Sequence, residues 1–310
     1  MKVPRGALGL PLALLALMVG FGLSSDYFLS RDTFVGIANE IPALLAMAVG
    51  MTFVLVIGGI DLSVGSVLAL ASAASALAIE TWHWNVPAAM AFGLVCGAAC
   101  GAVTGLISVR WRLPSFIVSL GMLEIARGGA YLVTGSRTLY IGSAIEWLSA
   151  PLWLGISPAF LVAIVIVIAS HIVLTRSVSG RYLIGIGTNE EAMRLAGIDP
   201  RPLKVCVFVL MGLLAGLAGL MQISRLEAAD PNAGIGMELQ VIAAVVIGGT
   251  SLMGGRGSVL NTLFGVLIVA VLEAGLAQIG ASDPAKRVTT GCVIIAAVLL
   301  DVYRARQRRS

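Results

Sequence analysis

Glu124 and Arg127 are charged residues of opposite sign, three positions apart within the apolar stretch LGMLEIARGGAYLVTG. That spacing places both side chains on one face of a helix. Charged groups inside a bilayer are unfavourable, so they either pair or line the route of a hydrophilic solute. Both interpretations stay open here: a structural ion pair that holds two helices together, or a charged lining. Glu40 and Glu273, in two other apolar stretches, are further candidates for such a lining or for hydrogen bonds between helices.

The residue patterns of covalent catalysis are missing from the sequence. There is no GxxxxGK[ST] phosphate loop, no HExxH and no cluster of His, Cys and Asp, and the histidines are His83 and His171 alone. No nucleophile–base pair is suggested either. We therefore predict that the chain is not an enzyme, has no catalytic residues and no metal site, and does not hydrolyse ATP itself. The four cysteines lie in apolar stretches and are interpreted as small buried thiols.

The composition indicates an integral membrane protein with an all-α fold. Of 310 residues, 58% are hydrophobic and 12% charged, whereas soluble globular proteins are about 25% charged. A helix needs roughly 20 mostly apolar residues to cross the hydrocarbon core. We therefore predict about ten transmembrane helices in a single domain, 1–310, the first being an uncleaved span. The stretches are 7–23, 34–57, 62–79, 86–109, 113–133, 158–175, 203–223, 237–253, 257–279 and 288–303.

The distribution of lysine and arginine predicts the orientation, because these residues accumulate in cytoplasmic loops. With ten spans and an internal N-terminus, fourteen of the 20 lysines and arginines fall on the cytoplasmic side and five on the outer side. We therefore expect both termini to be cytoplasmic. The basic tail, 304–310, is interpreted as part of this signal and as a contact with anionic lipid, not as a nucleic-acid site.

Small residues predict how some of the helices pack. Glycines recur every fourth residue along 86–109 and twice along 203–223, so a neighbouring backbone can approach closely. They are Gly93, Gly97, Gly101 and Gly105, with Gly212 and Gly216. Pro42 lies well inside the second apolar stretch and is expected to kink it.

Two similar segments, VIGGIDLSVGSVL (56–68) and VIGGTSLMGGRGSVL (246–260), each join one apolar stretch to the next on the cytoplasmic side. Internal repeats of transporters can mark functional segments. Asp61 is expected to cap the helix that follows it by accepting backbone N–H bonds. The turn is either a rigid corner that transmits movement or a capped turn needed for folding alone. The candidate residues are Gly58, Gly59, Asp61, Ser63 and Gly65, with Gly248, Gly249, Gly254 and Gly255.

The long cytoplasmic segment 176–204 contains a short helix-like stretch, NEEAMRLAGI. Asn189 is predicted to cap this helix, and Gly197 to end it. Glu190 and Glu191 suit its positive end. A short helix displayed on the cytoplasmic face is typical of a docking element for another protein.

Nearly the whole chain resembles a known family, the inner-membrane permease subunits of bacterial ABC sugar importers of the ribose, xylose, galactose and autoinducer-sugar type. Three blocks, GMTFVLVIGGIDLSVGSVLAL, LPSFIVSLGMLEIARGGAYLVTG and IAAVVIGGTSLMGGRGSVLNTLFG, are similar to that family's characteristic motifs. GTNEEAMRLAGI resembles the loop that such permeases present to their ATPase. It fits the pattern EAA-x3-G as Glu191-Ala192-Met193 followed by Gly197, with Met in place of the second Ala.

The resemblance implies a fold like that of the cobalamin-importer membrane subunit, in the bacterial inner membrane. It implies as partners an ABC ATPase that binds ATP and Mg, a second permease subunit that is the same or a homologous chain, and a periplasmic sugar-binding protein. Glu124 and Glu273 depart from the family, which often has a neutral residue and amides there; this departure indicates either an unusual substrate, such as a cationic or amino sugar, or only a different helix pairing. A nucleoside, a branched-chain amino acid, and ion-coupled secondary transport remain alternatives.

Overall fold

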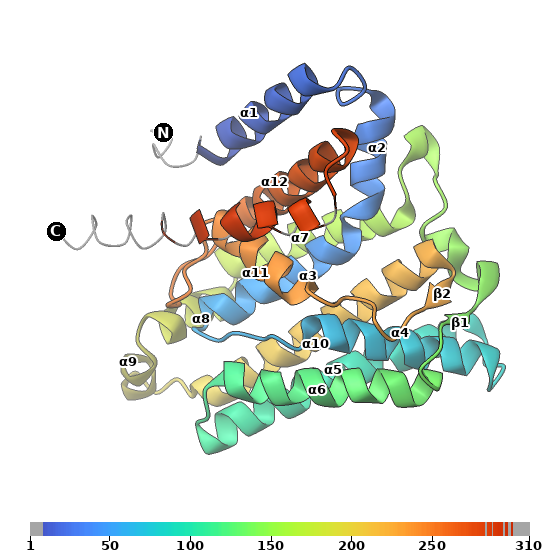
Figure 1. The fold of residues 1–310 in the computed structure, drawn as a ribbon. Coiled ribbons are helices and arrows are strands. Elements are labelled where there is room, and N and C mark those ends of the chain that lie inside the picture. The colour runs from blue at the N-terminus through green and yellow to red at the C-terminus, as the bar shows by residue number, and fades with distance from the viewer. Residues whose placement is uncertain (1–8, 283, 287, 294, 297–298, 300–310) are drawn as a thin grey trace.

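The computed structural model describes residues 9–282, 284–286, 288–293, 295–296 and 299, and most of these residues are helical (Figure 1). The helices are α1 (Gly9–Ser24), α2 (Arg31–Glu40), α3 (Pro42–Val56), α4 (Val64–Glu80), α5 (Val86–Trp111), α6 (Ser115–Thr134), α7 (Pro158–Arg176), α8 (Val178–Thr188), α9 (Glu190–Leu195), α10 (Pro200–Leu226), α11 (Met237–Ile247) and α12 (Val259–Gln278). Short 3-10 helices, η1 (Gly142–Leu148) and η2 (Trp153–Gly155), lie in the loop between α6 and α7.

Five of the described helices, α5, α6, α7, α10 and α12, are long and apolar enough to cross a membrane. The α2–α3 pair would form a sixth span, while α1, α4 and α11 are apolar but shorter. The fold is therefore that of an all-helical membrane protein. The predicted span 237–253 is helical only as far as Ile247, because Gly248 and Gly249 begin a turn there. In the predicted span 288–303, residues 288–293, 295–296 and 299 are described and helical, whereas the rest of that span and the basic tail 304–310 lie outside the described residues.

Pro42 breaks the second predicted span, as expected. α2 and α3 meet at Ile41 with a bend of 51°, and Pro42 occupies the first turn of α3, where its missing N–H has no intrahelical partner to lose. The bend turns α3 into the centre of the molecule. Every residue of α3 except Ala43 is buried, and its neighbours include α7, α10, α11 and α12.

The glycines of α5 and α10 bring these two helices into direct backbone contact, also as predicted. A Cβ atom on Gly97 would overlap the Gly212 carbonyl, and one on Gly101 would overlap the Phe208 carbonyl. The two backbones are so close at these positions that there is no space for even a methyl group, and the contact therefore requires glycine. Figure 1 shows α5 and α6 together on one side of the molecule and α1 and α12 on the other.

The loop 135–157 is fixed to the segment that follows α10. Strand β1 (Leu139–Tyr140) pairs antiparallel with β2 (Ala228–Ala229), so that Leu139 lies opposite Ala229. Ser149 Oγ also donates to the Ser224 carbonyl at 2.7 Å. This loop therefore lies over the C-terminal end of α10, where it forms part of the candidate site.

Candidate functional site

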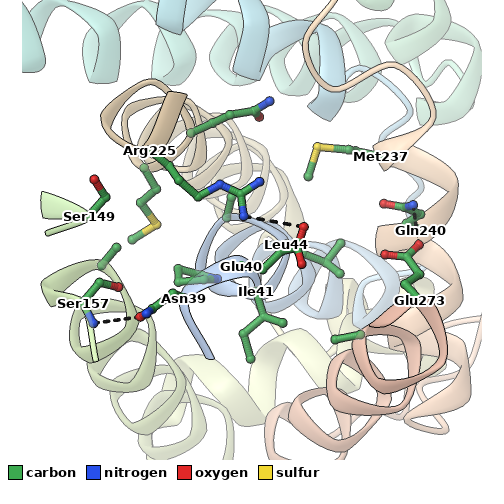
Figure 2. A pocket seen from close by; sticks show the side chains of 16 residues that line it. Asn39, Glu40, Ile41, Leu44, Ser149, Ser157, Arg225, Met237, Gln240 and Glu273 are labelled. Atoms are coloured by element: carbon green, nitrogen blue, oxygen red, sulfur yellow. Dashed lines mark hydrogen bonds and ion pairs between the residues drawn. The ribbon is translucent and has the colours of Figure 1, made fainter. Parts of the chain in front are cut away.

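Glu40 and Glu273, which lie more than 230 positions apart in the sequence, line one cavity of about 280 Å³. The cavity is formed where α2 meets α3, together with α10, α11, α12 and the loop before α7 (Figure 2). Its lining combines amide, hydroxyl and charged groups with an apolar wall. The lining residues are Asn39, Glu40, Ile41, Pro42, Ala43, Leu44, Ser149, Ser157, Ala159, Met221, Gln222, Arg225, Met237, Gln240, Ala270 and Glu273.

Glu40 and Arg225 form an ion pair in this cavity, with 3.6 Å between Glu40 Oε1 and Arg225 Nη1 (Figure 2). The Glu40 side chain is 67% exposed and that of Arg225 is 45% exposed. Pairs that stay this accessible contribute at most about 1 kcal/mol to stability. The pair therefore contributes little to stability, and both charged groups remain accessible to a solute.

Glu273 accepts a hydrogen bond from Gln240, whose Nε2 lies 2.8 Å from Glu273 Oε1. Gln222 lines the same cavity, and within the described part of the chain its buried Oε1 has no hydrogen-bond donor. Buried polar atoms are almost always paired, so an unpaired one beside a cavity needs a partner from the cavity itself. These groups can bind a solute that carries both donors and acceptors.

Asn39 holds the rim of the cavity. Its Nδ2 donates to the Gly155 carbonyl at 2.8 Å. Its Oδ1 accepts from the Ser157 N–H at 2.8 Å, the bond that Figure 2 shows. Ser157 in turn caps α7. One amide therefore joins the end of α2 to the start of α7.

Arg127 lies outside this cavity and contacts the loop between β2 and α11. Its Nη1 donates to the carbonyls of Pro231 and Ala233, while the nearby Tyr131 hydroxyl bonds to Asn232 Oδ1 at 2.6 Å. Among the ion pairs of the described residues none joins Arg127 to Glu124, whose side chain is exposed on α6. Arg127 thus attaches α6 to the loop without Glu124, and neither residue lines the cavity.

Asp61 is almost completely buried in the turn between α3 and α4. Its Oδ1 accepts from the Ser63 N–H at 2.9 Å and the Ser63 hydroxyl at 2.6 Å. Asp61 accepts a backbone N–H as expected, but the predicted cap is wrong, because both donors belong to the N-cap residue Ser63 and not to a residue of α4. Burial raises the pKa of the Asp61 carboxyl above its ordinary value, and the bonds from Ser63 oppose that rise.

Two serines of α6 hold the same turn. Ser115 Oγ accepts from the Ile60 N–H at 2.9 Å, and Ser119 Oγ accepts from the Leu62 N–H at 3.0 Å. Neither serine is among the candidate residues of the turn predicted above. Their spacing of four positions at the start of an apolar helix is the signal that would have drawn attention to them.

The two repeated turns meet at one junction with the end of α8. The Gly255 N–H donates to the Val56 carbonyl at 2.9 Å. A Cβ on Gly187 would overlap the Val56 carbonyl and crowd the Gly255 amide, and one on Gly254 would lie 3.0 Å from Gly58 Cα. The turns 56–59 and 248–255 therefore form one packed unit with α8.

The short helix α9 follows this junction directly. Asn189 Oδ1 accepts from the Ala192 N–H at 3.0 Å, and the chain leaves the helix at Gly197 with φ +83°. The predicted cap and helix end are confirmed. Glu190 bonds Lys204 at the start of α10 at 2.9 Å, and Glu191 bonds Arg194 at 3.2 Å. No residue of α9 is buried.

The polar partners of the two predicted acids were missed at the sequence level. Arg225 is one of the five basic residues on the predicted outer side, and Gln222 and Gln240 lie near the ends of apolar stretches. Polar residues near span ends are common, so only the fold reveals that these face Glu40 and Glu273.

Comparisons with known proteins identify similar chains among transport permeases. Residues 33–298 match the family described as branched-chain amino acid transport system / permease component. The chain is 40% identical to the ribose import permease protein RbsC of Escherichia coli K12, over 94% of this chain and 92% of that one. It is 34% identical to the L-arabinose ABC transporter permease protein AraH of Azospirillum brasilense, over 97% and 89%, and 33% identical to the fructose import permease protein FrcC of Rhizobium meliloti, over 94% and 84%. No solved structure matches it.

Proposed function

This chain belongs to the permease component family of branched-chain amino acid transport systems, and from that premise we propose that it is the membrane-spanning permease of an ABC importer for a monosaccharide. The relatives named for ribose, arabinose and fructose support a sugar as the solute. The chain itself carries out no covalent chemistry. ATP and Mg bind to a separate ATPase subunit, and the coupling between the two is conformational.

The observation that carries the proposal is the polar cavity between helices that are otherwise apolar. A sugar presents hydroxyl groups that both donate and accept hydrogen bonds. The Glu273 carboxyl and Gln222 Oε1 are acceptors, while Gln240 and Arg225 supply donors. We propose that Glu40 and Glu273 line the solute path. A path lined by Glu124 and Arg127 instead is the alternative to this assignment, and the Glu124→Gln variant discussed below tests it.

We propose ten spans in the membrane. The five long helices, the bent α2–α3 pair and the shorter helices α1, α4 and α11 would account for nine, and 288–303 for the tenth. This arrangement corresponds to the fold of the cobalamin-importer membrane subunit. It places the cavity toward the outside of the bacterial inner membrane and both termini in the cytoplasm. A second permease, the same or a homologous chain, and a periplasmic sugar-binding protein complete the importer.

We propose that α9 docks on the ATPase and that the junction behind it transmits the movement. α9 is exposed, it follows Gly187 and Thr188 directly, and its Glu190 is tied to the start of α10. Asn189, Glu190, Glu191, Ala192 and Gly197 form the coupling element. The buried Asp61 turn then acts as a rigid corner, because the serines of α6 and the Gly255 amide fix it from two sides.

A branched-chain amino acid is the second candidate solute, in keeping with the description of the family. One side of the cavity is apolar, with Ile41, Leu44 and Met237, and the Glu40–Arg225 pair offers both charges that a zwitterion needs. The relatives named for sugars favour the first candidate.

Purification of the chain from its native membrane in mild detergent tests the proposal. We expect mass spectrometry to find an ABC ATPase with it. The recovered complex, reconstituted in vesicles with the binding protein, should import a labelled pentose or hexose in the presence of ATP, and excess leucine should not compete. Competition by an amino sugar alone would identify that subclass of sugar. Recovery of the chain alone, with import abolished by a protonophore, would overturn the proposal in favour of ion-coupled transport.

A further inference from the structure

Three arginines converge on a second cleft, of about 750 Å³, at the end of the molecule where α5 ends and α10 begins. Arg110 lies in the last turn of α5, Arg112 follows that helix, and Arg201 lies in the first turn of α10. The remaining lining is apolar and includes Leu106 and Val205. This cleft is separate from the cavity that contains Glu40 and Glu273, and the two have no lining residue in common.

None of the three arginines takes part in an ion pair within the part of the chain that the structure describes. The neighbouring Asp199 caps α10 by accepting the Arg201 N–H at 3.1 Å, and among the described residues no ion pair joins the Asp199 and Arg201 side chains. Arg201 is also unfavourable for its own helix, because a positive charge opposes the dipole at a helix N-terminus. Arg110 and Arg112 suit the negative C-terminal end of α5, so helix electrostatics explains the position of these two arginines but not that of Arg201 beside them.

The surroundings of the cleft match the boundary between lipid and water. Trp111, 65% exposed, lies between two of the arginines, and tryptophan concentrates at membrane interfaces. Leu106 is 55% exposed one turn deeper along α5, and Phe116 is 44% exposed at the start of α6. The apolar wall of the cleft is thus continuous with the exposed apolar surface of the spans.

We propose that this cleft binds one anionic phospholipid of the inner leaflet. The arginines bind the headgroup phosphate, and the acyl chains lie along Leu106 and Val205. Guanidinium groups fit phosphate oxygens through paired hydrogen bonds, and basic pockets between transmembrane helices on the cytoplasmic side suit such headgroups. The apolar wall favours a lipid over a free phosphate or an acidic protein surface, neither of which would fill it. The bound lipid would join α5 to α10 at the end that faces α9.

Native mass spectrometry of the chain, purified in mild detergent and titrated with phosphatidylglycerol, tests the proposal. Phosphatidylcholine with the same acyl chains and inorganic phosphate serve as comparison ligands. We expect one phosphatidylglycerol to be retained in preference to phosphatidylcholine. Each arginine near an anionic headgroup contributes on the order of a fivefold change in affinity. The variant R110Q/R112Q/R201Q should therefore bind it far more weakly, and each single variant about fivefold more weakly.

The matched control is R176Q/R181Q/R256Q, which removes the same charge from three exposed arginines outside the cleft and should bind as the unchanged chain does. The variant R110K/R112K/R201K keeps the charge but not the paired bonds, so it should bind with intermediate affinity and shows that the site can be altered without unfolding. Equal loss in the control triple, equal retention of phosphatidylcholine, or displacement by inorganic phosphate alone would overturn the proposal. So would a cleft variant that keeps its lipid but no longer retains the ATPase, since the arginines would then serve a protein partner.

Discussion

At the scale of single residues, Asp61 combines near-complete burial with two hydrogen bonds from Ser63. Burial raises the pKa of its carboxyl, so the folded protein binds that proton more tightly than the unfolded chain does. The free energy of unfolding therefore falls as the pH rises above the ordinary pKa of 3.8. An amide at this position carries no such dependence, and its oxygen can accept the same two bonds.

We therefore expect Asp61→Asn to assemble normally and to be at least as stable as the unchanged chain at neutral pH. Its melting temperature in detergent, relative to that of the unchanged chain, should rise as the pH is raised from about 4. The reason is that ionisation of the buried carboxyl destabilises the unchanged chain, whereas the amide does not ionise. A lower melting temperature at every pH would contradict this. Normal assembly with loss of transport would show that the turn transmits movement, whereas loss of the protein from the membrane would show that it serves folding.

Glu273 and Glu124 are both acidic residues that the sequence predicts as candidates for lining the solute path. The structure places them in different environments. Glu273 lines the cavity and Glu124 is exposed on α6. We expect Glu273→Gln to raise the KM for ATP-driven import roughly two- to tenfold, the contribution of about one hydrogen bond. Glu124→Gln is the matched control and should leave KM unchanged. The reverse pattern, measured by uptake at varied sugar concentration, would move the path to α6.

At the scale of helices, the packing of α5 on α10 depends on the absence of side chains. Gly101→Val would force the two backbones apart, because a Cβ there overlaps the Phe208 carbonyl. We expect a destabilisation of about 1–3 kcal/mol, the usual effect of overpacking, seen as a lower melting temperature in detergent. Gly121→Val, on α6, is the control, since a Cβ there has no atom within 4 Å. Equal effects of the two changes would show that valine in a helix, and not the contact, is responsible.

The helices also show what the sequence could and could not predict. Pro42, the α5 glycines and the Asn189 cap act through local or pairwise rules, and the structure confirms all three predictions. The predicted span 237–253 extends past the end of α11, because the sequence stays apolar beyond Ile247 while Gly248 and Gly249 turn the backbone out of the helix. The partners of Glu40 and Glu273 come from helices distant in sequence, so no local pattern could assign them.

At the scale of the whole molecule, the cavity and the junction beside α9 are connected by the same helices. α3 begins beside the cavity at Pro42 and ends at the junction at Val56. α11 has Met237 and Gln240 at the cavity and is followed by the junction turn 248–255. α10 starts at the contact with α9 and reaches Arg225 in the cavity. Nearly every residue of α3 is packed against other helices. A displacement at one end of α3 is therefore transmitted to its other end.

We propose that a partner bound at α9 acts on the cavity through these three helices. Leu195, 83% exposed at the end of α9, offers an apolar contact to such a partner. We expect Leu195→Asp to leave the amount of protein in the membrane and its melting temperature unchanged, since no residue of α9 is buried. The variant should retain much less ATPase through purification, and import should fall in proportion. Ile235→Asp, an exposed residue just before α11, places the same charge at the opposite end and should retain the ATPase fully. Undiminished ATPase binding by the α9 variant would mean that the partner docks elsewhere, and the direct route from α9 through the junction to the cavity would then be wrong.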